Sequence, residues 1–485
     1  MTRICVAISE ADAASAIAVA REAIARGAEC LEFRFDHMPM LPDDLTPFQQ
    51  LEVRRIATLR EREQGGEWEG TNEKKWEFLW RAARAGFDID LELGHPLVNR
   101  AHLLKPAKVI VSYHDNKKTP QVARIIESLV ECSARSDMAK AAYSVRTMHD
   151  LAQLVEATDW FSLSRERYTV IGMGEMGMVT RVLAHRMGSV LSYASVSPGK
   201  ETAPGQLDLE TSKWLGKEPV VTGIIGNPLD HTLSPLMHNA AFRAAAVRGV
   251  YLKWVTMVDE LEDFLDVVEV LGIKGFNVTI PHKETIVPLL DRVDPVAERL
   301  GAVNTVVNEG GSLVGRNTDV IGVERTFEGH GVDVKGRTAL VLGAGGASRS
   351  VLSFLMSKGA DADITNRTMG KAESLAKTFG AEAVTARVAE EKAYDIIVNC
   401  TPLGMKGFPQ EMSISPHVLR EGQFVMDTVY NPPVTPLLAE AARKNAIAVN
   451  GKDMLIYQAL ASFEMWTGKA VDYEVMDKAF REALP

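Results

Sequence analysis

The chain has 485 residues, of which 46% are hydrophobic and 24% charged, and its formal net charge at pH 7 is -10. This length exceeds what one hydrophobic core usually supports, so two or three domains are expected. The negative balance and the lack of a Lys/Arg-rich run argue against a nucleic-acid partner, because phosphate binding needs a basic surface.

Membrane and metal proteins are also disfavoured. No apolar stretch approaches the ~20 residues of a membrane span, and the first residues lack the apolar core of a signal peptide. The cysteines are scattered without C-x-x-C pairing, which is typical of a reducing compartment. The histidines do not converge with carboxylates or cysteines as metal ligands do. We therefore expect a cytoplasmic protein without a metal.

The first 205 residues alternate short apolar strands with helical stretches. The candidate strands are 4–8, 31–35, 55–60, 87–93, 108–114, 138–144, 168–173 and 190–195. Eight β/α units in about 200 residues predict a (β/α)₈ TIM barrel over residues 1–207.

Charged residues recur at the predicted C-terminal ends of these strands. They are Glu32, Arg34, Arg60, Glu92, His114, Lys140 and Arg181. One such residue would be a solvated loop charge, but a set at the mouth of a barrel predicts an active site. A lysine that is partly desolvated there, and near other cations, loses its proton more readily and can form a Schiff base. The alternative for Lys140 is a strand-end charge that reaches solvent.

The segment 169–181 carries three glycines, Gly172, Gly174 and Gly177, in dinucleotide-binding spacing. About twenty residues later comes the strand 190–195, which no acidic or basic residue closes as a Rossmann unit requires. We therefore expect a tight turn at the barrel mouth that lets Arg181 reach an anionic substrate.

A polar stretch at 208–219 predicts a linker or short connecting helix. Alternating β and α patterns then resume, with a change of character near residue 320. We expect an α/β substrate-binding domain at 220–320, a Rossmann domain at 321–430 and a C-terminal segment, 431–485, that returns to the substrate domain.

The segment 339–350 carries a second glycine-rich loop between a strand and a helix. Its candidate cofactor-binding residues are Gly343, Ala344, Gly345, Gly346 and Ala347. The next strand ends in Asn366, Arg367 and Thr368, where an NAD-binding protein has an acidic residue. Because arginine suits a 2′-phosphate, NADP is the expected cofactor.

Three further residues of the substrate domain are candidates for a polar site. Lys283 follows the strand in GFNVTIPHKE, and a hairpin-like stretch delivers Asn304 and then Asp319. From these residues alone a Lys–Asp pair is most simply a salt bridge.

Residues 220–485 resemble shikimate dehydrogenases through H-x-x-SP-x-x-HN, N-V-T-x-P-HK, G-A-x-N-T, N-T-D, GAGGA, NRT and G-x-x-M-L-x-x-Q. The resemblance implies NADPH reduction of the 3-keto group of 3-dehydroshikimate, with Lys283 and Asp319 as the catalytic pair. It implies further cofactor contacts at Thr401, Gly451 and Met454. The implied substrate contacts are Thr232, Ser234, Asn277, Thr279, Asn304, Tyr430 and Gln458. Thr232 stands where the family usually has serine.

Residues 3 to about 206 resemble type I 3-dehydroquinate dehydratases through E-F-R-x-D, T-x-R, D-x-E, S-x-H, the lysine at 140, GMG-x-x-G-x-x-(T/S)R and APGQ. The resemblance implies a substrate imine on Lys140, with His114 moving the C2 proton to the departing hydroxyl. Arg181 would clamp the substrate carboxylate. The other implied substrate contacts are Glu32, Arg34, Arg60, Thr202 and Gln206. The chain departs from the family at Gln64, where glutamate is usual, and at Thr202, which replaces serine.

The sequence thus predicts a bifunctional enzyme of the shikimate pathway with small-molecule substrates. Two alternatives remain: an enzyme of the same fold that also oxidises quinate, and a catalytically inactive metabolite sensor. Retention of Lys140, His114, Lys283 and Asp319 argues against the sensor.

Overall fold

The computed structural model describes residues 2–164 and 166–484. The chain divides into two compact units, Met1–Leu229 with Arg248–Lys274, and Asp230–Val247 with Gly275–Pro485. Among the described residues, no helix is long and apolar enough to cross a membrane.

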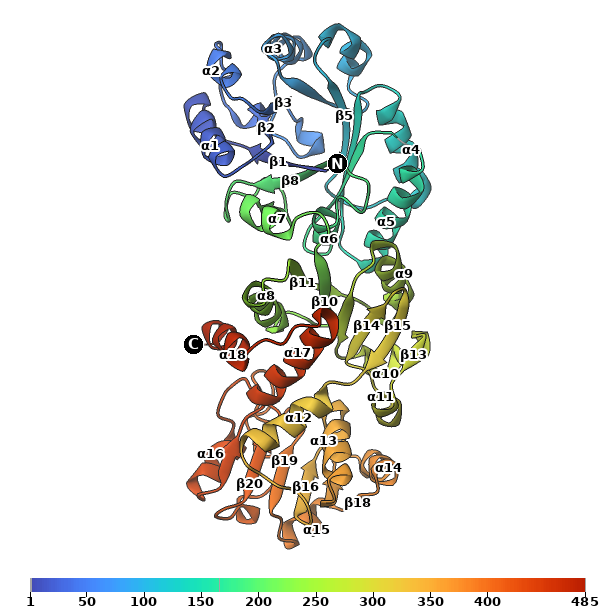
Figure 1. The fold of residues 1–485 in the computed structure, drawn as a ribbon, viewed down its shortest axis with the longest axis vertical. Coiled ribbons are helices and arrows are strands. Elements are labelled where there is room, and N and C mark those ends of the chain that lie inside the picture. Colours follow the sequence, from blue (N-terminus) through green and yellow to red (C-terminus); the bar gives the residue numbers. More distant parts are fainter. Residues whose placement is uncertain (1, 165, 485) are drawn as a thin grey trace. The chain divides into compact units, whose positions relative to one another are not determined.

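The first unit is built on a curled parallel sheet (Figure 1). Within the described residues its strands run in the order β7-β6-β5-β4-β3-β2-β1-β8-β9. Their bounds are β1 Arg3–Ile8, β2 Cys30–Arg34, β3 Arg54–Thr58, β4 Asp88–Glu92, β5 Val109–Asp115, β6 Met138–Ser144, β7 Tyr168–Met173, β8 Leu191–Ser195 and β9 Leu207–Asp208. This order confirms the predicted barrel, and all eight predicted strands are present.

Side chains help to close the barrel between β7 and β8. The Val190 N–H donates to the Tyr168 carbonyl at 2.8 Å. The Thr169 hydroxyl accepts from the Leu191 N–H at 3.0 Å, and the Ser189 hydroxyl accepts from the Val170 N–H at 3.1 Å. These hydroxyls occupy positions where a regular ladder would use carbonyls, so the seam keeps its N–H groups satisfied.

Helices cover the outside of this sheet (Figure 1). They are α1 Ala13–Ala25, α2 Thr46–Gln49, α3 Asn72–Arg84, α4 Val122–Ser133, α5 Met148–Ser162, α6 Met178–Val182 and α7 Leu209–Leu215, with a 3₁₀ helix, Pro96–Leu104, between β4 and β5. The expected connecting segment is α7, whose first turn is capped by Asp208. The unit also contains β10 Val220–Gly226, β11 Gly249–Val255 and α9 Leu261–Leu271.

The second unit begins with a mixed sheet. Strand β12 (Gly275–Val278) pairs antiparallel with β14 (Thr305–Glu309), and β14 forms the expected hairpin with β15 (Ser312–Arg316), which pairs with β13 (Arg292–Val293). The helices of this part are α8 Ser234–Ala244, α10 His282–Thr285, α11 Pro295–Leu300, α12 Asp319–Gly329, α17 Lys452–Thr467 and α18 Tyr473–Ala483.

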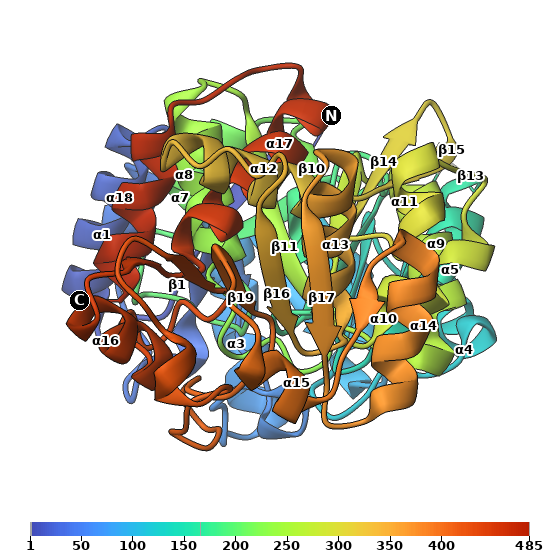
Figure 2. The same cartoon turned by 90° about the horizontal axis from the view of Figure 1, so that it is seen from below.

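A parallel sheet of order β18-β17-β16-β19-β20-β21 follows. Its strands are β16 Thr338–Leu342, β17 Asp361–Thr365, β18 Glu382–Ala383, β19 Ile396–Asn399, β20 Phe424–Asp427 and β21 Ile447–Val449, and its helices are α13 Gly346–Ser357, α14 Met369–Phe379, α15 Ala386–Glu391 and α16 Pro436–Arg443. Figure 2 shows α13 beside β16 and β17, on which it packs. This 3-2-1-4-5-6 order is that of a dinucleotide-binding fold, whose ligand crevice lies between β16 and β19.

Candidate active sites

Lys140 lies inside the barrel. It is the third residue of β6 and only 4% exposed, with Nζ 3.0 Å from Glu32 Oε1 and 3.2 Å from Asp90 Oδ2. The predicted desolvation is confirmed, but the prediction of a strand-end position was wrong. The groups nearest its ammonium are carboxylates rather than the expected cations. The carboxylates lie close to the ammonium because the inward-facing side chains of β2, β4 and β6 meet in the interior of the barrel.

A buried network holds Arg60 beside this lysine. Its guanidinium donates to Asp90 at 2.8 Å and to the Ser112 hydroxyl at 2.7 Å. Burial opposes the charge on Arg60, but Asp90, Glu92 and Glu32 outweigh burial and raise its pKa. Lys75, which is fully buried, donates to Glu92 at 2.8 Å. Glu92 therefore forms an ion pair with Arg60 but does not line the cavity.

His114 is a partly exposed base that lines the cavity. Burial, with help from Arg60 and Lys140, lowers its pKa well below the ordinary 6.5. The Gln64 side-chain oxygen accepts the His114 backbone N–H at 3.0 Å, so Gln64 lies in the site. Glu63 is exposed and does not line the cavity, so it does not replace the usual glutamate.

Arg181 is a buried cation without a carboxylate partner in the described part of the chain. Its Nε has no hydrogen-bond partner there, and Nη1 makes only a long hydrogen bond, 3.4 Å to the Tyr193 carbonyl. Burial lowers its pKa to about 10. A buried guanidinium in this state is stabilised by an anionic ligand.

The glycine loop before Arg181 makes a turn, as expected. Gly174 has φ of +94°, and a Cβ on Gly177 would lie 2.5 Å from the backbone of Gly172. The loop packs on the segment before Gln206, since the Gly174 N–H donates to the Pro204 carbonyl at 3.1 Å. Helix α6 has only 5 residues, which leaves no extended helix behind the loop to serve a dinucleotide.

The remaining predicted residues border the same cavity. Thr202 donates to the Gln206 side-chain oxygen, from its N–H at 2.7 Å and from its hydroxyl at 3.2 Å. Arg34 is held by a bidentate pair with Asp36, at 2.9 and 2.7 Å. The cavity is lined by Glu32, Arg34, Arg60, Gln64, Gly65, His114, Asn116, Lys140, Ala142, Ile171, Met173, Arg181, Tyr193, Thr202, Ala203 and Gln206.

Sequence reasoning missed several members of this site. Asn116 and Tyr193 line the cavity, and Asp90 and Ser112 bind its cations. Asp90 is the first residue of the D-x-E motif. Period-two alternation along its strand would have predicted that its side chain points into the barrel. Tyr193 has no such signal, because an aromatic residue in a buried strand is ordinary core.

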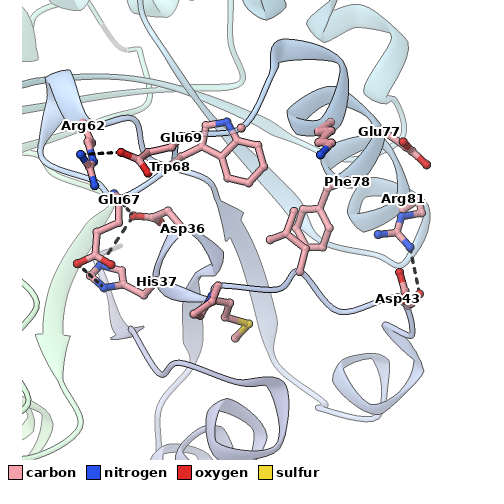
Figure 3. A pocket seen from close by; sticks show the side chains of 15 residues that line it. Asp36, His37, Asp43, Arg62, Glu67, Trp68, Glu69, Glu77, Phe78 and Arg81 are labelled. Carbon is pink, nitrogen blue, oxygen red and sulfur yellow. Dashed lines mark hydrogen bonds and ion pairs between the residues drawn. The ribbon is translucent and has the colours of Figure 1, made fainter.

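A separate cavity of about 700 Å³ lies beside the loops that follow β2 and β3 (Figure 3). Figure 3 shows Arg62 paired with Glu69, and Glu67 beside His37 and Asp36. None of the predicted catalytic residues lines it. It does not carry the chemistry described above.

In the second unit, Lys283 and Asp319 form the predicted pair. The lysine Nζ lies 2.6 Å from Asp319 Oδ2, and Asn304 Nδ2 donates to Asp319 Oδ1 at 2.7 Å. Asp319 is 8% exposed at the start of α12. The carboxylate is thus fixed on both oxygens, while the lysine, from the short helix α10, keeps a partly open head.

A buried hydroxyl network supports this pair. Thr318 Oγ1 lies 3.0 Å from Thr305 Oγ1 and 3.1 Å from Ser462 Oγ, and Asn277 Nδ2 donates to both Thr305 and Ser462. The network joins β12, β14, α12 and α17. Gln458 reaches it through Thr318 at 3.4 Å. Thr305 and Thr318 belong to the G-A-x-N-T and N-T-D motifs but were not predicted as site residues, and Ser462 lies outside every motif.

Other predicted substrate residues lie outside the network. The Thr232 hydroxyl accepts the Ser234 N–H at 3.4 Å where α8 begins, and Thr279 accepts the His282 N–H through its carbonyl. Tyr430 packs against Phe480, with ring centroids 5.7 Å apart. In the described residues, no hydrogen bond joins Thr232, Thr279 or Tyr430 to Lys283 or Asp319.

The second glycine loop has room for a pyrophosphate. Gly343 has φ of +102° and lies against Thr401, whose Cγ2 would be 2.9 Å from an added Cβ. An added Cβ on Gly345 meets nothing within 4 Å, and one on Gly346 meets only Lys283 Cδ, at 3.9 Å. The N–H groups that begin α13 therefore face open space beside Lys283.

Arg367 lies where a 2′-phosphate is expected. It is exposed after β17 and makes no ion pair in the described ranges, and Asn366 Nδ2 donates to the Thr368 carbonyl at 3.0 Å. Gly451 lies against the Thr428 carbonyl, where a Cβ would approach to 2.1 Å. Met454 is 8% exposed in a hydrophobic cluster, so packing accounts for most of its surface.

Four family descriptions match the chain. Residues 4–213 match type I 3-dehydroquinase, 224–306 the shikimate dehydrogenase substrate binding domain, 324–427 shikimate / quinate 5-dehydrogenase, and 451–479 the shikimate 5'-dehydrogenase C-terminal domain.

Known proteins are similar to the whole chain or to its shikimate dehydrogenase part. The chloroplastic bifunctional 3-dehydroquinate dehydratase/shikimate dehydrogenase of Arabidopsis thaliana is 32% identical over 93% of this chain and 80% of its own. The NADP(+) shikimate dehydrogenase of Moorella thermoacetica is 43% identical over 54% of this chain and 93% of its own. The crystal structure of Thermus thermophilus shikimate 5-dehydrogenase with NADP(H) and shikimate is 36% identical, with a TM-score of 0.51 over 55% of this chain and 100% of that one. The chain belongs to the family of bifunctional 3-dehydroquinate dehydratase/shikimate dehydrogenases.

Proposed function

We propose that the two sites act in succession, the barrel dehydrating 3-dehydroquinate through an imine on Lys140 and the second unit reducing 3-dehydroshikimate to shikimate with NADPH. The observation that carries the first half is Lys140, buried inside the barrel with His114 and an unpaired Arg181 around one cavity. Covalent amine catalysis needs a nucleophile and a base, and an anionic substrate adds the need for a cation to hold it.

Lys140 first gives up a proton and attacks the substrate ketone. The carboxylate of Glu32, 3.0 Å from Nζ, is placed to accept that proton, whereas Arg60 and Lys140 hold the pKa of Asp90 low, so that Asp90 stays ionised and orients Nζ. The C–N bond forms as water leaves, and the resulting protonated imine withdraws electrons from the neighbouring carbon. Neutral His114 then takes the C2 proton and returns it to the departing hydroxyl, which leaves as a second water. Hydrolysis of the imine restores Lys140 and releases the enone product.

Arg181 supplies the charge that holds the substrate. A substrate carboxylate gives its buried guanidinium the missing partner, and charge-assisted pairs of this kind are among the stronger hydrogen bonds. Thr202 fixes the Gln206 oxygen, so the amide N–H₂ of Gln206 is the end that can donate to the ligand.

In the second unit, NADPH supplies a hydride when it is bound beside the second glycine loop. Lys283 donates a proton to the oxygen of the reduced carbonyl, and Asp319 holds the lysine in position at 2.6 Å. Arg367 supports the choice of NADP, because it lies just after β17 without a partner in the described residues.

The four free cysteines fit the cytoplasmic location that the sequence predicts.

Borohydride trapping tests the imine. Reduction in the presence of 3-dehydroquinate should fix the substrate carbon skeleton on Lys140, which peptide mass spectrometry locates. Lys140→Met should give no adduct and no dehydratase activity, while its NADPH-dependent reduction of 3-dehydroshikimate continues. Dehydratase activity without any adduct in the wild type would contradict the imine mechanism.

A further inference from the structure

The ring of Tyr193 lies directly against the reactive nitrogen of the barrel. Lys140 Nζ is 4.2 Å from the centroid of this ring, within the range of a cation–π contact. Tyr193 is 4% exposed on β8, and its ring packs in a hydrophobic cluster with Cys5 and Cys30. The cation therefore meets the ring in a largely water-free place, where such contacts are strongest.

The Tyr193 hydroxyl does not explain the residue. It has no hydrogen-bond partner within residues 2–164 and 166–484. Burial, with Glu32, raises its pKa well above the ordinary value, so the phenol stays neutral and does not exchange protons near neutral pH. The part of Tyr193 that can act on the neighbouring cation is therefore the negative face of its ring.

The number of N–H groups on Lys140 changes during the reaction. An ammonium has three N–H groups, and it donates to both Glu32 and Asp90. A protonated imine has one, so it can keep a direct hydrogen bond to only one of these carboxylates. A contact with a ring face needs no N–H donor, and it persists through the change.

We propose that the face of the Tyr193 ring stabilises the positive charge on the Lys140 imine and thereby speeds dehydration. This inference rests on the proposed imine at Lys140. Tyr193 is then a catalytic residue of the barrel, in contact with the reacting nitrogen.

A fluorination series in the full-length chain tests the ring. Phenylalanine, 4-fluoro-, 3,5-difluoro- and 3,4,5-trifluorophenylalanine are placed at position 193, since each fluorine weakens the negative face with little change of size. Phenylalanine is the reference of the series, because it keeps the ring face and removes only a hydroxyl that has no partner in the described residues. Across the series kcat should fall by about tenfold with little change in KM, and the borohydride-trapped fraction should fall in parallel.

The same series at Tyr168 is a matched control. Tyr168 is 2% exposed on neighbouring β7, and its ring packs against Phe161 rather than a cation. Its series should be flat from phenylalanine onward, and NADPH-dependent reduction should stay constant in every variant.

Three outcomes would overturn the proposal. A flat series at 193 together with a slow Tyr193→Leu variant would make the ring a packing residue only. A large loss in Tyr193→Phe would transfer the effect to the hydroxyl. A wild type that dehydrates its substrate without giving an adduct would remove the imine itself, which is a failure of the proposed function rather than of the ring.

Discussion

In the proposed mechanism the two candidate sites use lysine in different ways. The Lys140 side chain is 5% exposed and contacts two carboxylates and an aromatic ring, whereas the Lys283 side chain is 24% exposed and contacts one carboxylate. A lysine that forms a covalent bond must be surrounded by groups that manage its charge before and after the bond. A lysine that only delivers a proton needs one partner to aim it. The environment therefore separates nucleophile from acid where the residue type does not.

The sites also differ in how the chain builds them. The barrel site takes its side chains from several strands of one parallel sheet and from the segments that follow those strands. The second site joins β12, β14, α12 and α17, so residues as far apart as Asn277 and Ser462 share a hydrogen bond at 3.1 Å. Damage to one site should leave the other intact, since each lies within its own compact unit.

The largest expected effect is the loss of the barrel nucleophile. Lys140→Met should lower dehydratase kcat by on the order of 10⁴-fold or more, because no other group can form the imine. Product formation from 3-dehydroquinate measures this. A loss of less than tenfold would mean that Lys140 is not the nucleophile.

Removal of the proton donor should be severe but smaller. Lys283→Met should lower kcat for 3-dehydroshikimate reduction by about 10²- to 10⁴-fold, the usual range for a general acid. NADPH oxidation measures it, and dehydratase activity on the same sample is the control. Equal losses in both activities would indicate misfolding instead.

Arg367→Ala separates the cofactors. A lost charge-assisted contact to the 2′-phosphate should raise KM for NADPH by about 10- to 100-fold and leave KM for NADH almost unchanged. Initial rates with both cofactors measure the ratio. Equal increases would contradict the 2′-phosphate role of Arg367.

The pH profile of the barrel sharpens the role of His114. Its pKa lies below 6.5, and only neutral histidine accepts the C2 proton, so activity should persist as pH falls below 6.5. Gln64→Glu adds a negative charge beside it, which favours the charged histidine and should move the acid limb upward by about one pH unit. An unmoved limb would show that His114 does not govern it.

The smallest expected effect is on substrate choice. Thr232→Ser restores the serine that is usual in the family and removes one methyl group just before α8. Because the added methyl group is what favours the quinate alternative, the ratio of quinate to shikimate oxidation, measured as kcat/KM, should fall by less than about tenfold. A ratio that stays constant or rises would contradict this role of Thr232.

Much of the fold was predictable from the sequence, because β/α alternation is a local pattern. The strand at 138–144 was predicted with its observed bounds, and the loop at 339–350 was recognised because a helix and a second strand follow it. The position of Lys140 within the barrel was not. Buried parallel strands lack polar alternation, so register across β2, β4, β6 and β8 decides which side chains meet.

The most direct test is a coupled assay that starts from 3-dehydroquinate and follows NADPH. The wild type should consume NADPH, Lys140→Met and Lys283→Met should not, and a mixture of the two variants should recover the activity because each supplies the site that the other lacks. Lys140→Met should also consume NADPH at the wild-type rate when 3-dehydroshikimate is added. NADPH consumption from 3-dehydroquinate by Lys140→Met alone at the wild-type rate would contradict the proposal that the buried lysine of the barrel performs the first step.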